Sequence, residues 1–236
     1  MSFFSSRFST ISIHLLLTAC LFLSACGPSG DPLTPLKKEL AKEKEYSIIL
    51  NDMREEGNFV PSYFHQYRVD IGEKTTQRKP VEVTKQFYKK NERYLGMALA
   101  TRTPDGKETQ SPIPNGYQYV GNQQYGQWRT NQSGGSFWEF YGKYMMISQA
   151  MRWAGFGLGR SHYNSYSSGL VSNRPYFGPN RQYGTNGSIT KRQKPDFFAR
   201  KAARKVRANS RFQDRVRQRT GRSKNTFRSR GYSFGK

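Results

Sequence analysis

The sequence is poor in acidic side chains and in cysteine. Its 236 residues contain 16 Asp and Glu against 39 Lys and Arg, which gives a formal net charge of +23. This imbalance excludes a near-neutral cytosolic enzyme as the starting hypothesis and favours anionic partners. Cys20 and Cys26 are the two cysteines, so a disulfide framework cannot compensate for a small core.

Apolar side chains are also scarce. The hydrophobic fraction is 35% with Tyr included. Leaving out Tyr and counting Gly gives roughly 38%, against roughly 45–50% for typical globular chains. We therefore expect one compact domain with poorly packed flanks rather than two full domains.

The longest apolar run lies near the N-terminus, from Ile11 to Leu23, and follows a single charged side chain, Arg7. This arrangement is typical of a secretory signal peptide. The run is shorter than the about 20 residues needed to cross a bilayer. We expect residues 1–25 to be a cleaved signal, and an uncleaved helical anchor is the alternative.

The end of this segment, Leu23-Ser24-Ala25-Cys26, resembles the lipobox of bacterial lipoproteins. The resemblance covers these four residues and the apolar run before them. It implies cleavage before Cys26, diacylglycerol on the Cys26 sulfur and a further acyl chain, such as palmitate, on its amine. Two or more acyl chains hold a protein stably on a membrane without a spanning helix.

A second cysteine, Cys20, ends a similar sequence, but cleavage there would leave an apolar segment on the mature chain. The residues after Cys26, 27–30, are Gly, Pro, Ser and Gly, which favour a turn and a flexible start. The resemblance therefore implies a protein anchored in a bacterial cell membrane. Gly27 is compatible with the outer membrane facing the periplasm, and the inner membrane or the cell surface remains open.

If Cys20 leaves with the signal and Cys26 is acylated, the mature protein has no free thiol. An internal disulfide, thiol redox chemistry and a thiolate metal site are then excluded.

The mature chain is predicted to be α+β, with a small sheet and one or two packed helices. Residues 26–44 would form a tether and a short charged helix, and residues 45–154 the small domain. Period-two alternation from Tyr63 to Ile71 predicts a half-buried strand. The other expected strands are Tyr46–Leu50, Val81–Phe87 (with a helix over Val81–Arg93 as the alternative), Leu95–Ala100 and Tyr117–Val120.

The four residues Ser136-Phe137-Trp138-Glu139 have the spacing of a capping box, in which serine and glutamate side chains satisfy helix-start amides. We therefore expect a buried helix from about Phe137 to Ala154, stopped by Gly155. Burial against the sheet is favoured over a position at a membrane interface.

Residues 155–190 are dominated by Gly, Ser, Asn, Tyr and Arg and contain few branched aliphatic side chains. Such a segment buries too little surface to offset the entropy lost on ordering. The sequence therefore predicts a disordered linker.

Residues 191–236 form a basic tail with 17 Lys and Arg against two acids, a net charge of +15. Pro195 suits the first position of a helix, and 100° steps place an apolar stripe opposite a basic face until about Gly221. The stripe consists of Phe198, Ala202, Val206, Phe212 and Val216. The candidate anion-binding residues are Arg200, Lys201, Arg204, Lys205, Arg207, Arg211, Arg215 and Arg217.

Three interpretations of this tail compete. A basic amphipathic helix suits an anionic surface, nucleic acid would bind the same charge, and many charged tails are simply solvated. Export favours partners of the envelope: anionic lipid, lipopolysaccharide, teichoic polymer or cell-wall polymer. The leading hypothesis is a lipid-anchored, non-catalytic envelope protein whose basic tail engages such a partner.

Catalysis has little support. His65 sits in an aromatic strand and His162 in the expected linker, and no metal-ligand cluster or nucleotide-binding motif is present. We therefore expect no catalytic residue, no metal and no cofactor. The alternative is an envelope enzyme or module that acts on or binds glycan, with Tyr119, Tyr125 and Trp128 as stacking faces.

Overall fold

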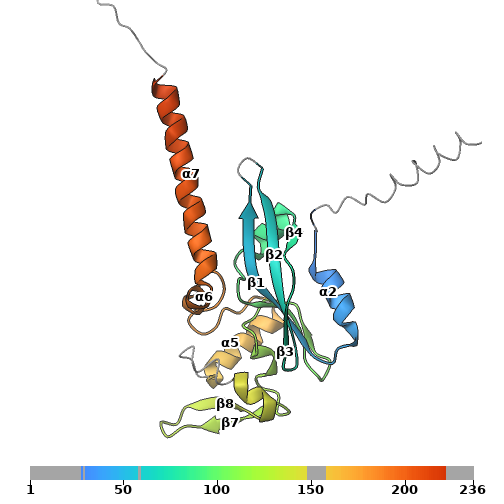
Figure 1. Cartoon of the computed structure of the whole chain (residues 1–236). Coiled ribbons are helices and arrows are strands. Elements are labelled where there is room, and N and C mark those ends of the chain that lie inside the picture. The colour runs from blue at the N-terminus through green and yellow to red at the C-terminus, as the bar shows by residue number, and fades with distance from the viewer. Residues whose placement is uncertain (1–27, 29, 58–59, 148–157, 222–236) are drawn as a thin grey trace, which may run out of the picture.

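The computed structural model describes residues 28, 30–57, 60–147 and 158–221 of the chain (Figure 1). Its strands are β1 (Tyr46–Glu56), β2 (Ser62–Ile71), β3 (Lys74–Gln77), β4 (Val81–Val83), β5 (Ala98–Arg102), β6 (Glu108–Thr109), β7 (Gly126–Thr130) and β8 (Ser136–Phe140). Its α-helices are α2 (Leu33–Glu39), α3 (Lys85–Asn91), α5 (Arg160–Val171), α6 (Ser188–Gln193) and α7 (Pro195–Gly221), with short 3-10 turns η1 (Leu40–Lys42), η2 (Tyr117–Tyr119) and η3 (Gly142–Tyr144). The predicted α+β class is confirmed.

An antiparallel sheet forms the centre of the fold. Its strands lie in the order β3-β2-β1-β5-β6, and β4 pairs with the other end of β2. A separate hairpin, β7 with β8, lies at the opposite end of the molecule from the turn between β1 and β2 (Figure 1). The connections from β1 to β2, from β2 to β3 and from β5 to β6 are short, as the antiparallel arrangement allows, whereas β5 joins β1 only after β2, β3, β4 and α3.

The alternation predicted in β2 is confirmed. Tyr63, His65, Tyr67 and Val69 are buried, and the residues between them are half-buried. Val81–Arg93 divides into the two structures that were considered for it, a short strand β4 and the helix α3. The change occurs at Thr84, whose hydroxyl accepts a hydrogen bond from the Phe87 amide and so caps α3.

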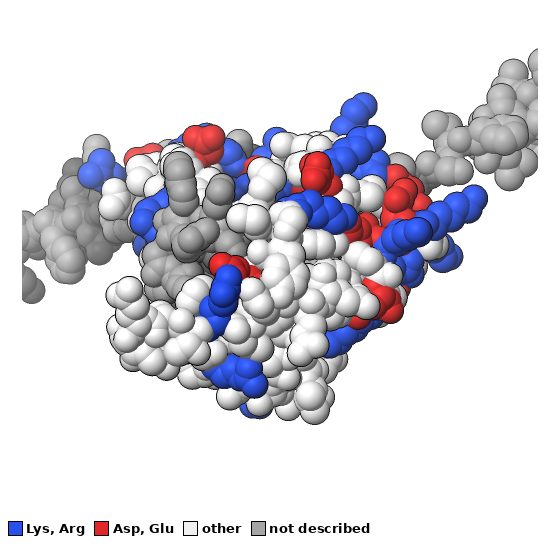
Figure 2. Space-filling view, turned by 90° about the horizontal axis from the view of Figure 1, so that it is seen from below, with Lys and Arg blue, Asp and Glu red and all other residues white. Residues whose placement is uncertain are grey.

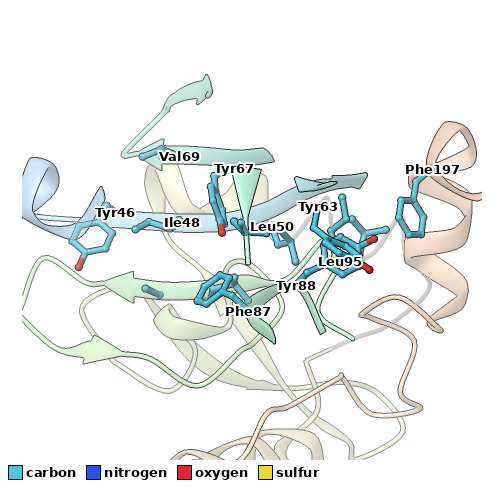
Figure 3. Close-up of a cluster of buried hydrophobic side chains, with 14 of the residues drawn as sticks. Tyr46, Ile48, Leu50, Tyr63, Tyr67, Val69, Phe87, Tyr88, Leu95 and Phe197 are labelled. Atoms are coloured by element: carbon cyan, nitrogen blue, oxygen red, sulfur yellow. The ribbon is translucent and has the colours of Figure 1, made fainter. Parts of the chain in front are cut away.

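The buried side chains form two clusters. The first lies between the sheet, α2 and α3, and includes Ile48, Leu50, Tyr67 and Leu95 (Figure 3). The second connects the other side of the sheet to β7, β8 and α5 and is rich in Tyr and Trp. Aromatic rings thus supply much of the apolar surface that the aliphatic residues of this sequence lack.

A buried carboxylate connects the start of β1 to the second cluster. Glu45 accepts hydrogen bonds from the Tyr119 and Tyr144 hydroxyls, each at 3.1 Å, and from Lys143 at 2.5 Å. Its side chain is 9% exposed. Three donors on one buried carboxylate offset the loss of its hydration, and they fix η2 and η3 against the sheet.

The predicted helix over residues 137–154 is wrong for its first part. Residues 136–140 form β8, and Trp138 lies opposite Trp128 of β7, with ring centroids 5.2 Å apart. As part of β8, Trp138 and Phe140 are buried in the second cluster, and this tertiary burial together with the cross-strand pair outweighs the local capping-box pattern. Met145, Met146 and Ile147 are helical, and the rest of the predicted helix lies outside the described residues.

The predicted strand at Tyr117–Val120 is also wrong. Tyr117, Gln118 and Tyr119 form the turn η2, which follows a left-handed glycine, Gly116, with a φ of 97°. All three side chains are buried there. The backbone turns because the two tyrosines point into the second cluster rather than along a sheet edge.

The predicted disordered linker is wrong for residues 158–190. This segment contains α5 and the first half of α6, and Tyr166 and Tyr176 are buried in the second cluster. Both rings contact Tyr117, with centroids 5.5 and 5.3 Å away. Buried tyrosine rings provide the apolar area that a count of aliphatic residues misses, so the packed unit continues past residue 154.

Candidate functional site

Helix α7 is the most highly charged element that the structure describes. It has 27 residues, runs from Pro195 to Gly221 as the sequence predicts, and carries nine Lys and Arg against two Asp. Asp196 lies in the first turn, where a negative charge favours the helix start. Figure 1 shows α7 projecting beyond the central sheet, and the side chains of α7 from Lys205 to Thr220 are exposed.

The base of α7 is fixed by one aromatic side chain. Phe197 is 6% exposed and belongs to the first cluster. It points from α7 toward Tyr63 of β2 and Tyr88 of α3 (Figure 3). Phe198 packs edge-on against it, with ring centroids 5.0 Å apart. The helix is therefore anchored through its first turn, while the rest extends beyond the sheet.

Polar contacts run from this anchor along β1. The Arg200 guanidinium donates to the Asp52 carboxylate at 2.6 Å, and Arg204 donates to the Glu55 carbonyl at 2.7 Å. Arg204 also lies 3.2 Å from the Glu55 carboxylate. Both pairs are partly exposed, so each contributes about 0–1 kcal/mol to stability. These pairs orient α7 relative to β1 but contribute little to the free energy of folding.

A third contact precedes α7. The Lys194 ammonium donates to the Asn51 side-chain oxygen. Burial lowers the pKa of Lys194, and the nearby Arg68 guanidinium lowers it further. The interactions with β1 therefore begin before the helix and continue for its first three turns.

A groove of about 480 Å³ lies between α7, the end of β1 and α3. Its walls carry charges of both signs, and its apolar surface includes Met53, Tyr88 and Phe197. The basic residues along it come mostly from one face of α7, because Arg200, Arg204, Arg207 and Arg211 repeat at helical spacing. The groove is therefore a second charged surface beside the exposed part of the helix.

The predicted anion-binding residues fall into three groups. Arg200 and Arg204 form ion pairs with the body. The second group lines the groove: Lys201, Arg207 and Arg211. The third group is exposed outside it: Lys205, Arg215 and Arg217. Cys26, the predicted lipid attachment site, lies outside the described residues.

The predicted apolar stripe of α7 does not face the body along most of its length. Val206 is 67% exposed, Phe212 63% and Val216 41%. Phe198 is the member that is half-buried. The side chain that anchors the helix, Phe197, lies on another face, and the sequence pattern did not predict it, nor Asp52 and Glu55, which pair with Arg200 and Arg204. Acidic residues at the end of β1, opposite a basic helix, were the available signal for this contact.

Of the candidate catalytic and sugar-binding residues, His65, Tyr119 and Tyr125 are enclosed, whereas His162 and Trp128 are half-buried. His65 is fully buried beside Tyr67, as expected of a packed residue. Tyr119 and Tyr125 are 8% and 3% exposed, and the Arg160 guanidinium covers the Trp128 ring at 4.6 Å. The two tyrosine rings therefore present no open stacking face to a glycan.

Other surfaces and sites give no competing candidate. Seen from the end that carries β7 and β8, the molecule is largely uncharged, and its charged side chains are scattered (Figure 2). Within the described ranges, no three His, Cys, Asp or Glu side chains gather as metal ligands. Among these same residues, no helix has the length and hydropathy of a membrane span. No family model, curated protein or solved structure matches the chain.

Proposed function

We propose that this chain is a lipid-anchored protein of the bacterial cell envelope whose helix α7 binds the anionic surface of a membrane. The observation that carries the proposal is the projecting helix itself, which has a net charge of +7 from nine cations and two acids. Each Lys or Arg near an anionic bilayer contributes about 1 kcal/mol to binding. The protein acts by binding and not by catalysis.

The exposed apolar residues favour a lipid surface over a hydrophilic polymer. Val206, Phe212 and Val216 follow one side of α7 and are exposed in the described part of the chain. A teichoic or cell-wall polymer needs cations but gives no place for these side chains. In a membrane interface, an apolar stripe lies below the headgroups while the flanking Lys and Arg contact phosphates.

The geometry supports both attachments reaching one membrane. Figure 1 shows α2 beginning on the side toward which α7 projects. Acyl chains on Cys26 would be separated from α2 by the tether of residues 26–32, which spans at most about 25 Å when extended. A membrane held by the lipid therefore lies within reach of α7, which favours two contacts with one bilayer over a bridge between two layers.

The first test removes charge from the exposed part of α7. We expect the double variant Lys205→Gln/Arg215→Gln to bind phosphatidylglycerol-containing vesicles about 30-fold more weakly, because two cations contribute about 2 kcal/mol. Vesicle co-sedimentation of the soluble chain, residues 27–236, measures this. Added salt should weaken binding of the parent chain.

The matched control is Lys74→Gln/Lys107→Gln, which removes the same charge from exposed positions on β3 and the turn between β5 and β6. It should bind nearly as well as the parent. An equal loss in both double variants, or parent binding that does not change with salt, would contradict the role of α7.

The second test addresses the anchor. We expect Cys26→Ser to abolish acylation, so that intact mass spectrometry of the cellular protein finds no acyl mass and the chain leaves the membrane fraction. Cys20→Ser is the control and should leave both unchanged. A Cys26→Ser product that still carries acyl chains, or a parent chain that carries none, would refute lipid anchoring.

A further inference from the structure

The groove beside α7 has an excess of positive charge. Its charged lining consists of Arg54, Glu55, Glu56, Glu92, Arg200, Lys201, Arg204, Arg207 and Arg211. Six cations against three carboxylates give a net charge of +3. An anionic ligand would therefore meet a favourable potential there, strengthened by the partial exclusion of water.

Each carboxylate of the groove already has a cationic partner. Glu55 lies 3.2 Å from Arg204, Glu56 lies 3.6 Å from Arg54, and Glu92 lies 2.9 Å from Lys89 outside the groove. The acidic wall is thus neutralised by these pairs and does not oppose an incoming anion with its full charge.

Two cations of the groove have no such partner. Lys201 and Arg207 form no ion pair among the residues that the structure describes. The Lys201 ammonium lies 5.9 Å from the Phe197 ring centroid, and the Arg207 Nε donates to the Ala203 carbonyl at 3.4 Å. The terminal nitrogens of both side chains remain available for an anion, and a guanidinium matches phosphate oxygens in a fork.

The groove also offers apolar surface next to these cations. Met53, Tyr88 and Phe197 form its floor, where each exposes less than 9% of its surface, and the methylene stems of the Lys and Arg side chains that line the groove add further apolar surface. Ala208 lines the same groove from α7 and leaves it open, because its side chain is only a methyl group. A volume of about 480 Å³ lies within the range of small-molecule sites.

We propose that this groove binds one phosphate ester that carries an apolar group, with the phosphate on Lys201 and Arg207 and the apolar group over Met53 and Phe197. The site is distinct from the surface proposed for membrane binding, because the groove lining and the exposed stripe of Val206, Phe212 and Val216 are centred on different faces of α7, which adjoin where Phe212 follows Ala208 by one turn. One ligand molecule occupies the groove, in contrast to the membrane surface that binds the exposed stripe. Both a lipid headgroup with its chain and a free organic phosphate contain this chemistry.

Calorimetric titration with octyl phosphate, kept below its micellar concentration, tests the site on the soluble chain, residues 27–236. Inorganic phosphate and octanol serve as the two half-ligands. We expect octyl phosphate to bind at a single site at least about tenfold more tightly than either one, because phosphate and chain each contribute. If inorganic phosphate binds as tightly, the apolar surface has no role and the proposed ester is wrong.

Two pairs of variants locate the binding. Arg207→Gln should weaken octyl phosphate binding by about tenfold, and Ala208→Trp should abolish it by filling the groove. The controls Arg217→Gln and Ala203→Trp make the same changes at exposed positions of α7 outside the groove. Equal losses in variants and controls, or no saturable binding by the parent chain, would overturn the site.

The same variants separate this inference from the proposed function. Ala208→Trp should still bind anionic vesicles, because Ala208 is not a member of the exposed stripe and its replacement removes no charge from α7. Loss of octyl phosphate binding with vesicle binding retained supports a distinct site. Vesicle binding that disappears together with octyl phosphate binding in Ala208→Trp would contradict it.

Discussion

Phe197→Ala should lower the free energy of unfolding by about 3 kcal/mol, because it removes the aromatic side chain that anchors α7 and leaves a cavity at the end of the first cluster. Phe197 is 6% exposed and lies against the cluster of Tyr63 and Tyr88. The polar contacts of Arg200 and Arg204 are partly exposed and cannot replace this burial. Urea unfolding followed by circular dichroism measures the change.

Phe212→Ala provides the matched control, since it makes the same substitution on the same helix at a residue that is 63% exposed. It should change stability by less than about 0.5 kcal/mol. Hydrogen exchange then identifies the part that loosens: amides of the first turns of α7 should exchange faster in Phe197→Ala and not in Phe212→Ala. Equal stability of the two variants would show that α7 is not anchored through Phe197.

This anchor illustrates what the sequence pattern reveals about α7 and what it does not. Pro195 marks the helix start correctly because its backbone preference is local. The choice between Phe197 and Phe198 is not local: neighbouring residues on a helix point 100° apart, and the better apolar stripe contains Phe198. Phe197 faces the first cluster because α7 is oriented so that Arg200 and Arg204 pair with Asp52 and Glu55 of β1.

The difference between local and long-range information also explains the errors in the predicted fold. Buried and half-buried residues alternate along β2, and this pattern can be recognised from the sequence of the strand alone. The predicted strand is confirmed. Whether residues 136–140 form a strand depends on Trp128, eight residues earlier than Ser136, and a capping-box spacing contains no information about it. Local patterns thus succeed where burial is periodic and fail where a partner elsewhere in the chain decides.

Tyrosine accounts for the error over residues 158–190. Leaving the 15 Tyr out of the apolar count made the core look too small for this segment to fold. In the structure, Tyr117, Tyr166 and Tyr176 are nearly enclosed, and their rings contact one another. A tyrosine ring buries as much apolar area as an aliphatic side chain, while its hydroxyl finds a polar partner. In tyrosine-rich chains, composition therefore underestimates how much can fold.

One buried polar group should make the stability of this fold depend on pH. Burial lowers the pKa of His65 to about 4, from about 6.5 in an unfolded chain. The His65 Nδ1 lies 3.0 Å from the Tyr67 hydroxyl, and Nε2 has no partner in the described structure. A proton added to the ring would place a charge in the core without a counter-ion, so the folded state keeps His65 neutral.

The direction of the effect follows from proton binding in the two states. Above pH 6.5 the ring is neutral in both, so His65 makes no pH-dependent contribution. As the pH falls below 6.5, the unfolded chain binds a proton that the folded chain does not, and stability decreases until the pH reaches the folded pKa. This group alone should lower the free energy of unfolding by about 2 kcal/mol between pH 7.5 and pH 5, and by about 3 kcal/mol at pH 4.

His65→Gln removes the titration while it keeps a polar side chain beside Tyr67. The variant should differ from the parent in the pH dependence of its unfolding free energy, whatever its stability at pH 7.5, and urea unfolding at several pH values measures this. His162→Gln on α5 is the control and should retain the decrease of about 2 kcal/mol that we assign to His65. A parent chain whose stability falls no further than that of His65→Gln by pH 5 would mean that the imidazole takes up a proton inside the folded protein.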